Sequence, residues 1–187
     1  ARETLPRLRS AGLKLFSEQW YEVVSVAEIC RRAGVSNGAF YRYFAGKEPL
    51  FFALLEDFLN KFESDLASVS GETFEERVRS FVRVVAGAAG RYAGEITVFR
   101  EGQYRFPQFE ERLRSAYLST VERIYGRRIS EVEYIYLLSG LRFVSTRSLF
   151  GDLEVDEELL VRLLLNGAFE PTPESAVLEP LPEPPPP

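Results

Sequence analysis

Three stretches of apolar residues at helical spacing each begin with the pair of a helical capping box, in which serine or threonine is followed three residues later by glutamate. The pairs are Ser25 with Glu28, Thr73 with Glu76, and Ser130 with Glu133. Apolar residues spaced three and four apart follow each pair, which is the pattern of a helix with one buried face. No Asn-Gly or Asp-Gly pair lies between alternating apolar residues, as it would in a β-hairpin. The sequence therefore predicts an all-α fold.

Further start and stop signals divide the chain into about nine helices. Gly34 and Gly151 are placed to end two of them, and Pro107 is suited to the first turn of another. Gly94 and Gly102 are expected to bracket a short helix. The expected helices cover residues 5–19, 25–34, 36–44, 47–67, 73–92, 94–102, 107–125, 130–151 and 156–167.

Composition limits the classes of function that the chain can have. Its hydrophobic content of 45% is ample for a packed core, but no apolar run is long enough for a membrane span. The N-terminus lacks a signal-peptide pattern, so we expect a cytoplasmic protein without a membrane partner. Because there is no histidine and only one cysteine, Cys30, no nucleophile–base pair or metal cluster is evident. We expect no catalytic residues, no metal and no cofactor.

Charge is unevenly distributed along the sequence. Residues 1–47 hold eight basic and four acidic residues, a net charge of +4, whereas the whole chain has a net charge of −5. A basic N-terminal region on an acidic remainder suits a protein that presents one end to a polyanion. Ordinary scatter of surface charge is the alternative.

The segment around Gly34 has helix-turn-helix spacing. Gly34 can adopt positive φ between two predicted helices, and Val35 can fill the angle between them. On the next helix Phe40 and Phe44 share one side and can pack on the preceding helices. The other side is free for the major groove of DNA or, alternatively, is only solvated. That side carries Asn37, Gly38, Tyr41 and Arg42.

Residues 5–55 closely resemble the DNA-binding domain of the tetracycline-repressor (TetR) family. The matching positions are Leu15, Phe16, Tyr21, the run from Ser25 to Ile29, the run from Arg32 to Phe44, Lys47, Glu48, Leu50 and Phe51. The resemblance implies a helix-turn-helix DNA-binding domain at residues 1–46 and an effector-binding and dimerisation domain at residues 47–170. A proline-rich tail follows at residues 171–187.

By the same resemblance, Ser25 donates to a DNA phosphate, and Lys47 clamps a phosphate from the start of the fourth helix. Asn37, Gly38 and Ala39 are expected in the groove next to the capping residue Ser36. Arg42 would read a base or a phosphate, and its fork suits guanine, as Asn37 suits adenine. The expected DNA-binding residues are Ser25, Ser36, Asn37, Gly38, Ala39, Tyr41, Arg42, Tyr43 and Lys47.

Four residues depart from the family pattern: Gly12, Trp20, Val24 and Cys30. Trp20 stands where the family usually has glycine, and we expect it to pack in the core or between helices. Val24 replaces a common threonine, so one phosphate contact could be lost. Cys30 is expected to fill the core as a small apolar residue.

Aromatic residues are concentrated between Tyr92 and Tyr125. The resemblance implies that helices four to eight enclose an effector pocket, and such a lining favours an apolar or aromatic molecule. Plain core packing is the alternative for each aromatic residue. Arg100, Gln103 and Arg105 are either anchors for a carboxylate- or phosphate-bearing ligand or part of a solvated loop. The expected pocket residues are Tyr92, Phe99, Tyr104, Phe106 and Tyr117.

The last two predicted helices are rich in apolar residues, and the first of them is apolar on more than one face. The resemblance implies that both pack against their twins in a four-helix bundle across a two-fold axis. Such a homodimer places two recognition helices about 34 Å apart, one turn of DNA. The expected interface residues are Leu138, Leu141, Leu149, Leu160 and Leu164.

The proline-rich tail has eight prolines in 17 residues, which excludes a regular helix or sheet of any length. We expect polyproline II or disorder there. Leu178 and Leu181 either anchor it on a neighbouring surface or remain solvated.

Taken together, sequence and resemblance predict a homodimeric repressor that binds a palindromic double-stranded DNA operator. A small apolar or aromatic effector would release it. The alternatives are a helical small-molecule-binding protein that does not use its N-terminal domain, a transcriptional activator of the same fold, and an enzyme.

Overall fold

The computed structural model describes residues 3–151 and 153–166, which form nine α-helices and no strand. The all-α prediction is confirmed. The predicted tail at residues 171–187 lies outside the described residues. The helices are α1 (Thr4–Glu18), α2 (Val26–Ala33), α3 (Asn37–Tyr41), α4 (Lys47–Ala67), α5 (Phe74–Arg91), α6 (Ala93–Arg105), α7 (Pro107–Tyr125), α8 (Glu131–Phe150) and α9 (Glu157–Asn166).

Local capping explains where several helices begin. Thr73 and Ser130 each accept a hydrogen bond from the backbone N–H three residues on, and Glu76 and Glu133 complete the predicted boxes. The third predicted box is only half formed. Ser25 accepts from the N–H of Glu28, but the Glu28 carboxylate accepts from Gln19 Nε2 at 3.3 Å. That carboxylate therefore ties α2 back to the end of α1.

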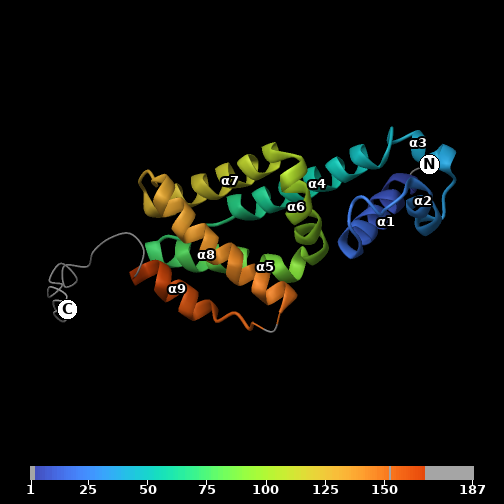
Figure 1. The fold of residues 1–187 in the computed structure, drawn as a ribbon. Helices are drawn as coiled ribbons and strands as arrows, with labels where there is room; N and C mark the ends of the chain where they lie inside the picture. The colour runs from blue at the N-terminus through green and yellow to red at the C-terminus, as the bar shows by residue number, and fades with distance from the viewer. Residues whose placement is uncertain (1–2, 152, 167–187) are drawn as a thin grey trace, which may run out of the picture.

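The helices are arranged as a small cluster joined to a larger one (Figure 1). We call α1 to α3 the head and α4 to α9 the body. In the body α4 packs along α7, while α5 packs against α8 and α9. Helix α6 contacts both α4 and α1, so it links the body to the head. No helix among residues 3–151 and 153–166 is both long and apolar enough to cross a membrane.

Helix α4 contributes to the cores of both clusters. Near its start the fully buried Phe51 ring lies 4.9 Å from Phe16 of α1, measured between ring centroids. Further along, Phe58 lies 5.5 Å from Phe99 of α6, and Phe62 lies 5.5 Å from Tyr117 of α7. Edge-to-face and tilted contacts of this kind stabilise aromatic clusters beyond simple burial. A displacement of α4 would therefore change the packing of side chains in both cores.

Helix α6 is longer than predicted because Gly94 and Gly102 lie inside it rather than at its ends. Gly102 is buried where α6 crosses α4, and a Cβ atom there would lie 2.6 Å from Leu55 Cδ1 and 3.1 Å from Phe51 Cε1. This glycine therefore permits close approach of two helices and does not end one.

We predict that Gly102→Ala lowers the free energy of unfolding by about 1–3 kcal/mol, because the added methyl overpacks a core built on Leu55 and Phe51. Gly90→Ala is the matched control. Nothing lies within 4 Å of its added Cβ, so it should be neutral or stabilise by up to about 1 kcal/mol. Urea denaturation measures both. Equal midpoints for Gly102→Ala and the unmodified chain would contradict the prediction.

Candidate nucleic-acid interface

The turn between α2 and α3 fixes the geometry of the head. Gly34 has φ of 64°, the left-handed conformation predicted for it, and caps the end of α2. The N–H of Val35 donates to the carbonyl of Cys30 at 3.0 Å, and Arg7 Nη2 donates to the carbonyl of Gly34 at 3.3 Å. Cys30 itself is buried, as predicted. The turn is thus held from within α2 and from α1.

Helix α3 presents opposite faces to the core and to solvent. Phe40 is fully buried and Phe44 is 8% exposed, which confirms that these two rings anchor the segment. Tyr41 is 57% exposed, and Asn37 and Arg42 are also exposed. The regular helix ends at Tyr41, earlier than predicted.

Ala39 and Gly38 differ in exposure. Ala39 was expected in a DNA groove, but it is 8% exposed, so its side chain lies in the head core beside Phe40. Positions 39 and 41 lie about 100° to either side of the buried Phe40, so both are at the edge of the inner face. The short Ala39 side chain stays within that edge, whereas the long Tyr41 side chain reaches solvent. Gly38 is exposed, and the nearest atom to a Cβ built there is Ser36 Oγ at 4.0 Å. Its surface can therefore approach another molecule closely.

Two exposed serines cap the helices of the motif. Ser25 Oγ accepts from the N–H of Glu28, and Ser36 Oγ accepts from the N–H of Ala39, each at 3.2 Å. Each hydroxyl keeps its own hydrogen, which can be donated outward. Both side chains are therefore suited to a phosphate oxygen at a helix N-terminus.

Arg42 is the exposed cation of this face. Its guanidinium makes no hydrogen bond or ion pair with any residue in the described part of the chain. Other head cations are engaged: Arg9 pairs with Asp57 at 2.9 Å, and Arg32 pairs with Glu18 at 3.1 Å. Arg42 can therefore bind an external anion or base edge without first breaking an internal pair.

Lys47 has a different role from the predicted phosphate clamp. Its Nζ donates to the backbone carbonyls of Tyr21 at 2.7 Å, Val24 at 2.8 Å and Glu22 at 3.1 Å. These bonds use all three ammonium hydrogens. The ammonium also lies 4.4 Å from the centroid of the Tyr21 ring. Lys47 therefore fastens the start of α4 to the turn between α1 and α2.

The same turn is held from α6, a feature that sequence reasoning missed. Both carboxylate oxygens of Glu101 accept from the N–H of Tyr21, at 3.0 and 3.3 Å. Arg105 pairs with Glu22 at 2.6 Å and lies 4.0 Å from the Tyr21 ring centroid. Burial raises the pKa of the Tyr21 hydroxyl. We call Lys47, Glu101 and Arg105 the turn clamp.

Trp20 is 74% exposed, so the expectation that it packs in the core is wrong. The chain leaves α1 here, and the next residue, Tyr21, turns into the core instead. Trp20 lines a surface cleft of about 520 Å³ between the end of α1 and α6. Tyr104, expected in the effector pocket, is 84% exposed and lines this cleft.

A small cavity of about 80 Å³ lies within the body. Phe99 and Tyr117, two of the residues expected in an effector pocket, line this cavity, and burial raises the pKa of the Tyr117 hydroxyl. Tyr92 packs just behind it on Phe58, with ring centroids 5.7 Å apart. The cavity is lined by Phe58, Phe62, Val85, Ala88, Ile96, Phe99, Arg100, Leu113, Tyr117, Arg142 and Thr146.

Phe106 does not line the cavity, contrary to expectation. It lies where α6 meets α7 and packs on Phe52 and Phe109, with ring centroids 5.4 and 6.1 Å apart. The residue sits at the junction of the two helices, so its ring fills the angle between them.

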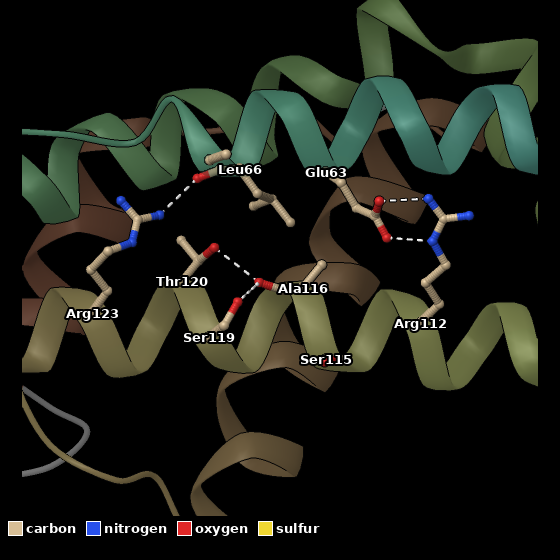
Figure 2. Close-up of a pocket in the computed structure, with 9 residues that line it drawn as sticks. Glu63, Leu66, Arg112, Ser115, Ala116, Ser119, Thr120 and Arg123 are labelled. Atoms are coloured by element: carbon tan, nitrogen blue, oxygen red, sulfur yellow. Dashed lines mark hydrogen bonds and ion pairs between the residues drawn. The ribbon is translucent and has the colours of Figure 1, made fainter.

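A wider groove of about 620 Å³ lies between α4 and α7 (Figure 2). Small side chains such as Ser115, Ala116 and Ser119 form part of its wall. Both of its arginines are engaged. Arg112 forms two 2.6 Å bonds with the Glu63 carboxylate, and Arg123 donates to the carbonyl of Leu66 at 3.1 Å. These bonds tie α7 to α4 and engage both guanidinium groups.

The residues expected in a subunit interface lie mostly inside the protomer. Leu138, Leu141 and Leu164 are 2%, 6% and 7% exposed, which places them in the protomer's own core and corrects the expectation. Leu149 and Leu160 are partly buried. The outer apolar residues of α8 and α9 are instead Val132, Ile135, Tyr136, Phe143, Phe150, Leu159 and Leu163, all 44% to 77% exposed. We call this set the outer apolar face.

The turn at Gly34 and the exposed face of α3 make the head a helix-turn-helix domain. Residues 8–54 match the family model for bacterial regulatory proteins of the tetR family. The HTH-type transcriptional regulator BetI of Rhizobium meliloti (strain 1021) is 31% identical over 137 residues, covering 72% of this chain and 63% of BetI. Residues 8–54 therefore carry the DNA-binding domain of the tetR family, and the chain is similar to TetR-family regulators over most of its length.

Two further comparisons extend this result. The regulator HbdR of Aromatoleum sp. (strain CIB) is 40% identical over 57 residues, or 30% of this chain and 25% of HbdR. The chain thus spans less than two thirds of the length of these curated relatives. The fatty acid degradation regulator FadR from Bacillus halodurans shares the fold, with a TM-score of 0.73 at 18% identity over 88% of this chain and 95% of that chain.

We predict that Lys47→Ala lowers the free energy of unfolding by about 1–3 kcal/mol, because three backbone carbonyls lose a charged donor. The salt dependence of DNA binding should keep its slope. Lys61→Ala is the control, since the Lys61 side chain is half-exposed and its one ion pair among the described residues, with Glu95, is long at 3.7 Å. Urea denaturation and a salt titration measure the two effects. Unchanged stability with a slope reduced by about 1 would support a phosphate clamp instead.

Proposed function

We propose that the chain is a cytoplasmic transcription repressor that binds a palindromic DNA operator as a homodimer and is released by a small apolar or aromatic effector. The observation that carries the proposal is the exposed face of α3, where Asn37, Tyr41 and Arg42 project from a helix anchored by the buried Phe40. Residues 1–46 would read DNA, and residues 47–170 would bind the effector and the second subunit.

The chemistry of the exposed α3 face supports DNA reading. The Arg42 guanidinium can donate two parallel hydrogen bonds to guanine O6 and N7, and the Asn37 amide can pair with adenine. Ser25 and Ser36 stand at the N-termini of α2 and α3, where hydroxyls and backbone N–H groups favour phosphate. Tyr43, which is 38% exposed, extends the same surface. These groups divide between base contacts and phosphate contacts, as specific binding requires.

The outer apolar face of α8 and α9 supports a homodimer. Tyr136 is 73% exposed, Val132 is 77% exposed and Phe143 is 66% exposed, so large apolar side chains share one outer face of α8. Leu159 and Leu163 are the exposed leucines of α9. Contiguous apolar patches of this kind mark interaction sites. A second copy related by a two-fold axis would cover the same face on both subunits.

The contacts of α6 support release by an effector. This helix carries Phe99 into the body cavity, and it also carries Glu101 and Arg105, which hold the turn between α1 and α2. A molecule that fills the cavity and shifts α6 would therefore change the orientation of the head. The effector would favour a conformation whose two heads no longer match the operator half-sites.

Selection of bound sequences from random double-stranded DNA tests the proposal. We predict a palindrome whose half-sites are about one helical turn apart. Arg42→Ala should weaken binding to the selected sequence by about 1–3 kcal/mol and relax the preference at one base pair in each half-site. Arg83→Ala removes the same charge from an exposed position on α5 and should leave affinity unchanged. Failure to enrich any sequence would contradict DNA reading.

We predict that Tyr136→Glu converts the dimer to a monomer at micromolar concentration, because two copies would bring a charge into the apolar contact. Tyr104→Glu makes the same change at a tyrosine that is 84% exposed on α6, and it should remain dimeric. Sedimentation velocity measures both. A dimer that survives Tyr136→Glu would exclude this face as the subunit interface.

A further inference from the structure

The mouth of the body cavity carries one arginine whose charge is not compensated. Arg100 of α6 lines both the cavity and the surface cleft at Trp20. Its guanidinium forms no hydrogen bond or ion pair with any residue in the described ranges, and its one charge-dependent contact there is the Phe150 ring at 4.7 Å. An aromatic face stabilises a cation less than a carboxylate does and leaves the guanidinium donors available.

The second arginine at the mouth has a different environment. Arg142 of α8 bonds to both carboxylate oxygens of Glu110, and its Nη2 also donates to Gln103 Oε1 at 3.2 Å. Its charge is therefore already balanced by α7 and α6. Two acidic side chains line the cleft together with Arg100, and both are engaged elsewhere: Glu18 pairs with Lys14 at 2.9 Å and Arg32 at 3.1 Å, and Glu101 accepts from the N–H of Tyr21. Arg100 is thus the charged group of this lining that can form a new ion pair with an anion entering the cavity.

The cavity behind Arg100 is apolar. Phe62, Phe99 and Leu113 line it, and all three are at most 5% exposed. Tyr117, Thr146 and Arg142 are the other polar side chains of the lining besides Arg100, and Arg142 is already paired with Glu110. A multiply charged molecule would therefore lose its hydration there and gain few new hydrogen bonds. An apolar or aromatic group would lose no hydrogen bonds to water on entering the cavity. A charged group at the end of such a molecule would remain at the mouth beside Arg100.

We infer that the effector is a monocarboxylate with an apolar or aromatic body, whose carboxylate pairs with Arg100 while its body occupies the cavity. This inference rests on the proposed function, because it names the ligand class of the same effector site. The cavity of about 80 Å³ favours a slender or small apolar body, and Arg100, which also lines the cleft of about 520 Å³, can meet the carboxylate from the cleft side.

The position of Arg100 also connects the ligand to the head. The next residue, Glu101, holds the N–H of Tyr21, and Arg105, one helical turn further on, pairs with Glu22. A carboxylate that draws Arg100 away from Phe150 therefore acts on the same stretch of α6 that grips the turn between α1 and α2. Ligand charge and head position are coupled through about one and a half turns of helix.

Two matched pairs of probes test the inference by isothermal titration calorimetry on the full chain. The pairs are 3-phenylpropanoate with 3-phenylpropanamide, and octanoate with octanamide, which differ only in the charge of the head group. We expect at least one carboxylate to bind about tenfold or more tightly than its amide, as a charge-assisted hydrogen bond would give. Arg100→Gln should abolish the difference, and Arg83→Gln, which removes an exposed charge on α5, should preserve it.

Two further measurements make failure informative. Ala88→Leu adds bulk to the cavity wall and should weaken carboxylate and amide alike, while thermal unfolding checks that the variant is folded. Equal binding of carboxylate and amide, a preference that survives Arg100→Gln, or no binding of any probe would overturn the inference. Operator binding by the unmodified chain, with no probe present, is measured in parallel. If the chain does not bind an operator, the proposed function is refuted. If it binds an operator but shows no preference for carboxylates, only the ligand class is refuted.

Discussion

The backbone of Tyr21 is held from two helices at once. Glu101 of α6 accepts from its N–H, and Lys47 of α4 donates to its carbonyl. The ring is buried 5.0 Å from Phe51 of α4, between ring centroids, and the guanidinium of Arg105 lies over it. Because Tyr21 contacts both α4 and α6, the orientation of the head depends on the positions of those two helices. The polar contacts make that orientation definite, since an apolar contact alone would tolerate sliding.

Local signals allowed most of the fold to be predicted from sequence. Thr73 and Ser130 begin helices because their hydroxyls and the following glutamates satisfy free N–H groups within the same turn. The sides of α3 were also predictable, since Phe40 and Phe44 are the apolar residues at helical spacing. Gly102 misled the prediction, because a glycine that ends a helix and one that admits a neighbouring helix look the same in a sequence.

The site was predictable only where it depends on one helix. The exposure of Tyr41 and Arg42 follows from the pattern of α3, whereas the bonds of Lys47 and Glu101 join segments separated by more than twenty residues. The buried side of α8 was harder to predict, because the helix has apolar residues on more than one of its faces. Its burial shows which side faces the protomer's core, with Leu138 inside and Tyr136 outside. That distinction depends on where α5 packs, which no local pattern records.

Trp20 is the one tryptophan of the chain, and its indole is largely exposed at the cleft between α1 and α6. All indole emission of the protein therefore originates at the junction of head and body. A rotation of the head against α6 changes the polarity around this ring and shifts the wavelength of that emission. The protein consequently carries an intrinsic optical reporter at the contact between its head and its body.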